Sequence, residues 1–263
     1  MSEYRLKMIV KYKESEVFYT DKGKGSAVVL LHGFLENHSM WNEVSGELSK
    51  KNRVITVDLL GHGKTDSVGY IHLMSEMALV VQTVLKKLRI RKSYFIGHSM
   101  GGYVSLEFAK LFPEKVKGIC LMNSTSQEDT EERKRIRKGA NEIAKKHLTK
   151  LIQNAIPNLF AEDSKEKNSE KIKEVLEQAK QTSVRGYMAA NEGMLLRTNN
   201  EEVLKQFEKR AIIVGKNDPV LNYDTIVKEA KRTNTTLVEF SNGHMSHIEN
   251  KELLIDFLKQ FVK

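Results

Sequence analysis

Short apolar runs recur along this chain, separated by stretches in which apolar positions follow a helical period. A short apolar run between polar turns is typical of a strand that is buried on both faces of a sheet. These runs predict strands at residues 27–31, 54–57, 94–96, 116–122, 211–214 and 236–240. Ahead of them, residues 6–11 and 16–19 predict a hairpin.

Helical periodicity follows most of these runs. Residues 73–88 carry apolar side chains three or four positions apart, and the helix predicted at 102–112 stops at Pro113. Further helices are predicted at residues 41–50, 225–231 and 251–262, the first with Ser39 as its N-cap. Alternating strands and helices indicate an α/β protein with a largely parallel sheet covered on both faces. Sites in such sheets lie at the carboxyl ends of strands.

The alternation of predicted strands and helices is interrupted between residues 123 and 207. This segment is long, highly charged and helix-periodic, with breaks near Pro157 and at residues 164–169. We interpret it as an inserted helical cap. The α/β core then consists of residues 1–122 and 208–263.

The 263 residues fit one large α/β domain or a domain with an insertion, and a hydrophobic content of 40% is enough for a sizeable core. No apolar run is long enough for a transmembrane helix, and residues 1–21 lack the apolar centre of a signal peptide. The single cysteine, Cys120, lies in an apolar run and is expected to be a buried structural thiol. We therefore expect a cytoplasmic protein.

The net charge of +9 invites a comparison with nucleic-acid-binding proteins. Between residues 128 and 180, however, 13 basic residues alternate with 11 acidic ones, which is typical of solvated helix faces. No aromatic residues are interleaved with the basic ones, and Trp41 is the only tryptophan. The charge pattern therefore argues against a nucleic-acid partner.

The predicted strand at 94–96 runs into the pattern Gly97-x-Ser99-x-Gly101, and a predicted helix follows. Gly-x-Ser-x-Gly between a strand and a helix is the form of a nucleophile elbow, a sharp turn that carries a serine hydroxyl at its tip. The two glycines are pressed together in such a turn and have no Cβ to clash. The sequence therefore nominates the Ser99 hydroxyl as a nucleophile.

A serine nucleophile needs a base to take its proton and a carboxylate to hold that base. His244 follows a glycine just after the last predicted strand, and we favour it as the base over His247. Asp218 follows the strand at 211–214 and is the candidate acid. Its alternative, Asp224, is expected to cap the next helix.

Attack on a carbonyl group creates an oxyanion, which needs preorganised N–H donors. One candidate is the backbone N–H of Met100, because the start of a helix favours negative charge. For the other we choose the N–H of Phe34, in the loop after the strand at 27–31, with Leu35 as the alternative. His32 is expected to support this loop, and His98 to pack beneath the elbow.

Five motifs resemble the α/β-hydrolase superfamily in order and spacing. They are Leu30-Leu31-His32-Gly33-Phe34, the loop at 58–66, the elbow at 97–101, Gly215-Lys216-Asn217-Asp218, and the segment at 243–247. Ser99, Asp218 and His244 also follow one another in the Ser…Asp…His order of that superfamily. The resemblance implies an eight-stranded, mostly parallel sheet with a helical lid over Ser99. The chain is most similar to small capped carboxylesterases and enol-lactonase-like hydrolases.

We therefore expect a cofactor-free serine hydrolase of carboxylic esters that forms an acyl-enzyme and acts on a small molecule. The same triad serves lactonases, thioesterases, carbon–carbon bond hydrolases and a lyase that completes a menaquinone precursor. A hydrolase-fold receptor that only holds its ligand is a further alternative. The sequence leaves the substrate and the oligomeric state open.

Three other patterns are weaker. Gly63-Lys64-Thr65 is not a phosphate loop, because Asp58 stands where the first glycine is required, and Asp58 is expected to anchor its own loop. His244-x-x-His247 lacks a third ligand, so no metal is expected. The segment at 131–137 offers arginines for an acidic substrate, although the surrounding opposite charges favour an exposed helix.

Overall fold

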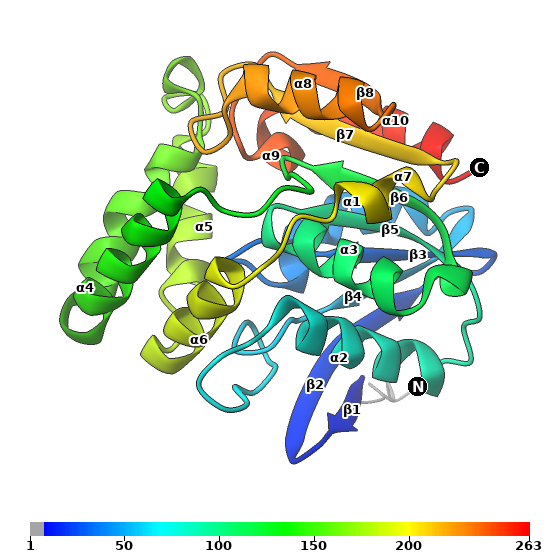
Figure 1. The fold of residues 1–263 in the computed structure, drawn as a ribbon, viewed down its shortest axis with the longest axis horizontal. Coiled ribbons are helices and arrows are strands. Elements are labelled where there is room, and N and C mark those ends of the chain that lie inside the picture. The colour runs from blue at the N-terminus through cyan, green and yellow to red at the C-terminus, as the bar shows by residue number, and fades with distance from the viewer. Residues whose placement is uncertain (1–7) are drawn as a thin grey trace.

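A central eight-stranded sheet carries helices on both faces in the computed structural model, which describes residues 8–263 (Figure 1). The first two residues of the predicted hairpin, Leu6 and Lys7, lie outside the described residues. The strands are β1 (Ile9–Tyr12), β2 (Ser15–Lys22), β3 (Ser26–Leu31), β4 (Asn52–Val57), β5 (Ser93–His98), β6 (Val116–Met122), β7 (Arg210–Gly215) and β8 (Thr236–Phe240). Their order across the sheet is β1-β2-β4-β3-β5-β6-β7-β8.

Only the β1–β2 and β2–β4 pairs are antiparallel, and the other neighbours run parallel. The predicted class, an eight-stranded and mostly parallel α/β sheet, is confirmed. The parallel strands β3 to β8 all end at the same edge of the sheet, so the loops that follow them meet there.

The helices are α1 (Asn42–Leu48), α2 (Met74–Lys87), α3 (Met100–Leu111), α4 (Glu131–Ala155), α5 (Ser169–Ala179), α6 (Val184–Leu195), α7 (Glu201–Lys205), α8 (Tyr223–Arg232), α9 (Ser246–Glu249) and α10 (Lys251–Phe261). Short 3-10 turns occur at His38–Trp41, Pro113–Lys115, Pro157–Leu159 and Glu162–Ser164. In the part of the chain that the structure describes, no helix combines the length and apolar character needed to cross a membrane.

Two hydrophobic clusters lie on opposite faces of the sheet, because successive strand side chains point to opposite sides. Val29 and Leu31 of β3 pack with side chains of α2, α3, α7 and α8. Val28 and Leu30 pack with side chains of α1 and α10. Cys120 belongs to the second cluster and is fully buried, as expected, and burial raises the pKa of its thiol.

Helices α4, α5 and α6 lie together beside the core (Figure 1). α4 is kinked at His147, whose backbone is not helical. A third hydrophobic cluster joins Ala144 and Ile152 of α4, Ala179 and Tyr187 with Leu35 of the core. We propose that residues 123–207 form the cap, with α4 to α6 as its body; α7, at its end, packs into the core cluster.

Helix α6 approaches the loop after β4 very closely. A Cβ added to Gly186 would lie 2.3 Å from the carbonyl oxygen of Gly61. A Cβ added to Gly193 would lie 1.8 Å from the carbonyl oxygen of His72. Helix α6 therefore packs directly against the backbone of the core, and this contact fixes the position of that part of the cap.

Two predicted helix caps are wrong. Asn37, not Ser39, caps the turn before α1, since its side chain accepts the Ser39 N–H at 2.9 Å. Asn222, not Asp224, caps α8 by accepting the Thr225 N–H at 3.0 Å, and Asp224 lies in the first turn. Asn and Asp rank almost equally as caps, so sequence could not separate close neighbours.

Candidate active site

The strand-to-helix turn at Ser99 has the strained geometry expected of an elbow. Ser99 lies between β5 and α3 with φ 49° and ψ −113°, a left-handed conformation that costs a non-glycine residue free energy. Its N–H donates to the carbonyl of Met122 at 3.0 Å. A Cβ on Gly97 would lie 2.3 Å from the carbonyl oxygen of Gly101, so the turn requires glycine there.

Asp218 and His244 meet from the loops after β7 and β8. His244 Nδ1 lies 2.8 Å from Asp218 Oδ2, and both side chains are almost completely buried. Asp218 Oδ1 accepts the N–H groups of Val220 at 2.8 Å and Leu221 at 3.0 Å. Burial raises the pKa of Asp218, but its pairing with His244 and its hydrogen bonds from Leu221 and Asn123 outweigh burial and hold the pKa below its ordinary value. The carboxyl is therefore ionised and fixes the ring through its Nδ1–H.

The elbow and this pair are brought side by side through His98, the residue before Ser99. The rings of His98 and His244 have centroids 5.1 Å apart, and His98 Nε2 lies 2.9 Å from the carbonyl oxygen of His244. Within residues 8–263 no hydrogen bond joins the Ser99 hydroxyl to His244. His244 can still act as the base, because catalytic hydrogen bonds often form or tighten only when substrate binds.

Asn123 holds the acid and base loops together, and sequence reasoning did not single it out. It directly follows β6 with φ 45°, and its Nδ2 donates to Asp218 Oδ2 and to the Gly243 carbonyl, both at 3.1 Å. The next residue, Ser124, donates its hydroxyl to the Ser99 carbonyl at 2.7 Å. The rule that sites follow parallel strands applies to β6 as well and could have identified Asn123.

The two candidate oxyanion donors occupy the expected elements. Met100 is the first residue of α3, where a helix leaves N–H groups without an intrahelical acceptor. Phe34 lies in the turn after β3, which closes through the Glu36 N–H and the Gly33 carbonyl at 3.3 Å. The alternative, Leu35, has φ 66°, and its side chain belongs to the third hydrophobic cluster, with Ala144, Ile152, Ala179 and Tyr187.

His32 and Asp58 support loops, as expected. His32 Nδ1 lies 2.7 Å from the Gly33 carbonyl, and its Nε2 accepts the Leu59 N–H at 2.9 Å. Asp58 accepts the N–H groups of His38 at 2.6 Å and Lys64 at 2.8 Å. Neither side chain is available as a base for Ser99.

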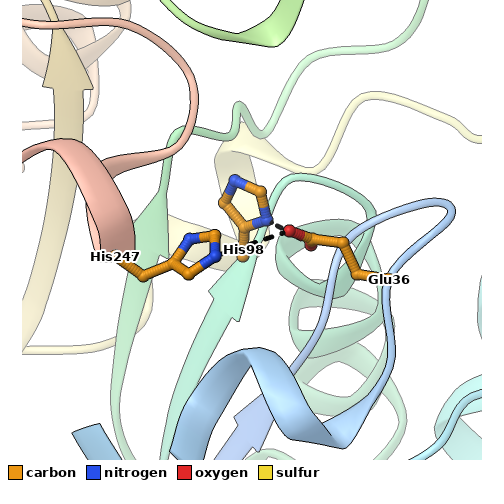
Figure 2. A group of neighbouring side chains, drawn as sticks. All are labelled: Glu36, His98 and His247. Carbon is orange, nitrogen blue, oxygen red and sulfur yellow. Dashed lines mark hydrogen bonds and ion pairs between the residues drawn. The ribbon is translucent and has the colours of Figure 1, made fainter. Parts of the chain in front are cut away.

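Glu36, His98 and His247 form a buried cluster behind the elbow (Figure 2). Glu36 Oε2 lies 2.7 Å from His98 Nδ1 and also accepts the Gly33 N–H at 2.7 Å. His247 Nε2 lies 3.8 Å from Glu36 Oε1. His247 therefore faces Glu36 and is not the histidine paired with Asp218.

Both ring nitrogens of His98 face acceptors, an arrangement that favours the doubly protonated, charged ring. Burial opposes this charge, but Glu36 raises the pKa of His98 above its usual value. Burial likewise disfavours the Glu36 anion, but His98 brings the pKa of Glu36 down to about 2. The three side chains are of the types that bind transition metals, yet a metal on His98 Nδ1 would have to replace its bond to Glu36.

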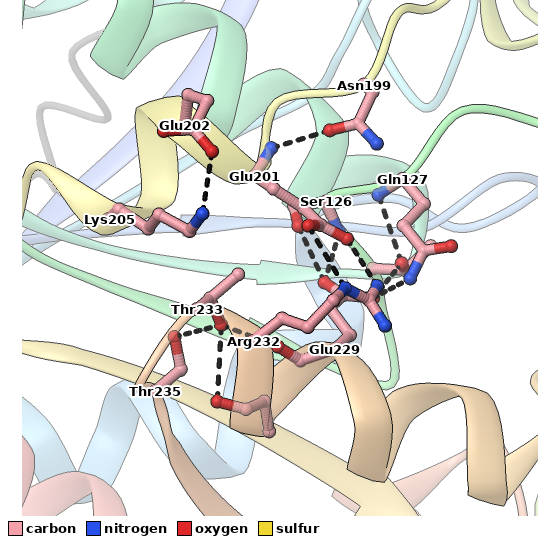
Figure 3. A network of polar contacts seen from close by, with 12 residues as sticks. Ser126, Gln127, Asn199, Glu201, Glu202, Lys205, Glu229, Arg232, Thr233 and Thr235 are labelled. Carbon is pink, nitrogen blue, oxygen red and sulfur yellow. Dashed lines mark hydrogen bonds and ion pairs between the residues drawn. The ribbon is translucent and has the colours of Figure 1, made fainter.

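Glu229 of α8 anchors the segment that links β6 to the cap (Figure 3). Its buried carboxylate accepts the N–H and the hydroxyl of Ser126, both at 2.7 Å, the Gln127 side chain at 3.3 Å, and the hydroxyl of Thr125. Burial raises the pKa of Glu229 in spite of these donors. The residues that Glu229 holds follow Asn123 and Ser124 directly, so Glu229 helps to fix the segment that carries these two site residues.

Comparison with known proteins identifies the class that this fold and site define. The family model described as the alpha/beta hydrolase fold matches residues 26–251. The chain belongs to this family.

Individual relatives differ in how much of the chain they match. An uncharacterized protein of Mycobacterium tuberculosis is 35% identical over 102 residues, which is 39% of this chain and only 30% of that relative. The 3-oxoadipate enol-lactonase 1 of Acinetobacter baylyi is 26% identical over 239 residues, covering 90% of this chain and 88% of the relative. A thermophilic esterase from Thermogutta terrifontis, solved with malate bound, matches with a TM-score of 0.88 and 25% identity over 97% of this chain and 98% of its own.

Proposed function

We propose that this protein is a cofactor-free serine hydrolase of carboxylic esters. Ser99 is the nucleophile, His244 the base, and Asp218 the carboxylate that fixes the His244 ring. The observation that carries the proposal is the 2.8 Å contact between His244 Nδ1 and Asp218, located beside a strained serine turn. This arrangement leaves Nε2 of His244 as the nitrogen that can accept a proton.

In the first half of the reaction, Ser99 Oγ bonds to the acyl carbon while its proton passes to His244 Nε2. The carbonyl oxygen becomes an oxyanion, which the N–H groups of Phe34 and Met100 stabilise. The bond to the leaving alcohol then breaks, and the alcohol oxygen takes the proton from His244. In the second half, water repeats these steps on the acyl-enzyme, releasing the acid and restoring Ser99.

The relatives support the reaction class. An esterase and an enol-lactonase both match the chain over more than four fifths of its length. A lactone is an internal ester, so the same steps would open its ring. Lactone hydrolysis is therefore our second candidate, favoured by the match to the enol-lactonase.

The proposal is tested by hydrolysis of short-chain p-nitrophenyl esters and of lactones. We expect Ser99→Ala to lower kcat at least about 1,000-fold, because no other group can form the acyl-enzyme. Ser169→Ala, at an exposed serine on α5, is the matched control and should keep wild-type rates. Retention of activity within about tenfold by Ser99→Ala would rule out Ser99 as the nucleophile.

A further inference from the structure

Two arginines share one buried carboxylate where the cap meets the elbow helix. Asp129 Oδ2 lies 2.5 Å from Arg137 Nε of α4, and Asp129 Oδ1 lies 2.8 Å from Arg197 Nη2. The exposed fractions of these side chains are 4% for Asp129, 11% for Arg137 and 5% for Arg197. The cluster therefore holds two positive charges and one negative charge away from water.

The two guanidinium groups differ in how many of their nitrogens have a hydrogen-bond acceptor. Arg197 also donates to the carbonyls of Gln127 at 3.1 Å and Met194 at 3.0 Å, so every nitrogen has an acceptor. Arg137 donates through Nη1 to Asn191 Oδ1 at 3.0 Å. Within residues 8–263, no hydrogen bond uses Arg137 Nη2. Asp129 and Asn191 therefore hold the Arg137 guanidinium in position, while the N–H groups of Nη2 remain available to a ligand.

The position of Arg137 connects it to the candidate active site. The Arg197 guanidinium lies on the Tyr103 ring, 4.0 Å from its centre, and the Tyr103 phenol also acts on the charge of Arg137. Tyr103 lies in α3 four residues after Ser99, and helical side chains lean back toward the N-terminus of their helix. Arg197, which shares Asp129 with Arg137, therefore contacts the elbow helix one turn after Ser99.

Helix α6 connects Arg137 to the oxyanion loop. Arg137 Nη1 donates to Asn191 of α6, which lies one helical turn after Tyr187. Tyr187 packs its ring against that of Phe34, with centroids 4.9 Å apart. Arg137 is therefore linked to the elbow helix through Asp129 and Arg197, and to the oxyanion loop through α6.

An excess buried charge is costly unless a counter-charge accompanies it. The charged groups that act most on Arg137 are Asp129 and, with the same sign, Arg197. A carboxylate on a ligand would balance the cluster, and its two oxygens match the free fork of a guanidinium.

We propose that Arg137 binds a carboxylate of the substrate, so that the preferred substrates are esters or lactones that carry a second, anionic group. The inference rests on the proposed hydrolase function and adds the substrate class. Arg137 acts as a specificity residue, anchored by Asp129 and Asn191. Arg197 fixes Asp129, and each of its three nitrogens already has an acceptor within the protein.

The test compares two p-nitrophenyl esters of equal chain length, a glutarate monoester with a free carboxylate and a neutral pentanoate. Wild type should prefer the anionic ester in kcat/KM. Arg137→Met should lower kcat/KM for the anionic ester about 10- to 100-fold, the loss of a charged hydrogen-bonded pair, and leave the neutral ester within about threefold. Arg135→Met, at an exposed arginine on the same helix, removes the same net charge and should change neither.

Arg137→Lys serves as a second variant if Arg137→Met folds poorly. It keeps the charge beside Asp129 but lacks the planar fork, so it should show an intermediate loss on the anionic ester alone. Equal losses on both esters would overturn the proposal and make Arg137 a structural residue. Lack of any wild-type preference for the anionic ester would overturn it as well.

Binding separates failure of this inference from failure of the hydrolase proposal. Dicarboxylates of four to six carbons should raise the Tm of wild type and Ser99→Ala, but not of Arg137→Met. If the Tm rises and no ester is hydrolysed, the anion site stands and the hydrolase proposal fails. If esters are hydrolysed but no dicarboxylate raises the Tm of wild type, the anion site fails.

Discussion

At the scale of single residues, His98 connects two parts of the candidate site. Its Nδ1–H is bonded to Glu36, and its Nε2–H to the carbonyl of His244. Because the second bond requires a proton on Nε2, the Glu36 anion helps to position the backbone of His244. Glu36 is therefore a positioning residue that does not itself touch the reacting atoms.

We expect Glu36→Gln to lower kcat about tenfold at pH 8, on the scale of one hydrogen bond, with a smaller loss at pH 5. Without the carboxylate, burial acts unopposed and lowers the pKa of His98 below its usual value. The ring is then neutral at pH 8 and no longer always donates from Nε2 to His244, and it regains its second proton as the pH falls toward 5. The measurement is kcat on a p-nitrophenyl ester across this range, relative to wild type.

The control for this prediction is Glu43→Gln, which removes an exposed carboxylate of α1 that pairs with Lys251. This variant should follow the wild-type pH profile. A loss in Glu36→Gln, relative to wild type, that is the same at pH 5 and pH 8 would contradict the positioning role of His98.

Sequence could predict the positions of Ser99, Asp218 and His244, because each follows a strand whose apolar run is clear. Their catalytic roles stay predictions. Asn123 directly follows β6, and the same rule could have identified it. Glu36 could not be assigned from sequence, since its importance depends on which side chains the fold brings opposite it. A buried partner such as His98, 62 positions away along the chain, leaves no local pattern.

At the scale of elements, the segment after β6 carries several functions in few residues. Asn123 holds the acid and base loops, Ser124 contacts the elbow, and Ser126 is fixed to α8 by Glu229. The first helix of the proposed cap, α4, follows this segment. The link between core and cap is therefore rigid where it passes the site.

We expect Glu229→Ala to lower the free energy of unfolding by about 3 kcal/mol, because it leaves several buried donors without an acceptor. Urea unfolding measures this change. Glu202→Ala removes an exposed carboxylate of α7 that pairs only with Lys205, and should change stability by less than about 0.5 kcal/mol. If Glu229→Ala also changed the free energy of unfolding by less than about 0.5 kcal/mol, the contacts of Glu229 would not be needed for stability.

Strands and most helices could be predicted because parallel strands and amphipathic helices leave periodic patterns. The way in which the cap packs against the core could not be predicted from sequence. It depends on the close contact between Gly61 and Gly186, and a glycine in a helical pattern does not indicate what lies opposite. The interpretation of the segment at 131–137 changed for the same reason, since Arg137 is largely buried although opposite charges surround it in sequence.

At the scale of the whole molecule, buried histidines link stability to pH. Burial lowers the pKa of His62 to about 3 and those of His72 and His247 to about 4. In the unfolded chain the same groups titrate near 6.5. Between these values the unfolded chain binds protons that the folded protein does not, so stability falls as the pH falls.

We therefore expect the free energy of unfolding to be lower at pH 5 than at pH 7. Each histidine contributes up to about 1.4 kcal/mol per pH unit to this slope. His98 offsets part of this loss, because its raised pKa makes it stabilise the folded protein more as the pH falls from 7 to 5, but three histidines act in the opposite direction. Urea unfolding at the two pH values is the measurement.

His247→Gln should reduce the difference between the two pH values, whatever its effect on stability at pH 7. His147→Gln, at an exposed histidine of α4, should leave the difference unchanged. Equal free energies of unfolding at pH 5 and pH 7 in the wild-type protein would contradict this account.

The central claim is that Ser99 is a nucleophile activated by His244, and covalent labelling tests it most directly. A fluorophosphonate should add one label to the wild-type protein, seen by intact mass and mapped by peptide analysis to Ser99. Labelling should be absent in Ser99→Ala and strongly slowed in His244→Ala. A wild-type protein that stays unlabelled, or a label that persists in Ser99→Ala, would contradict the account.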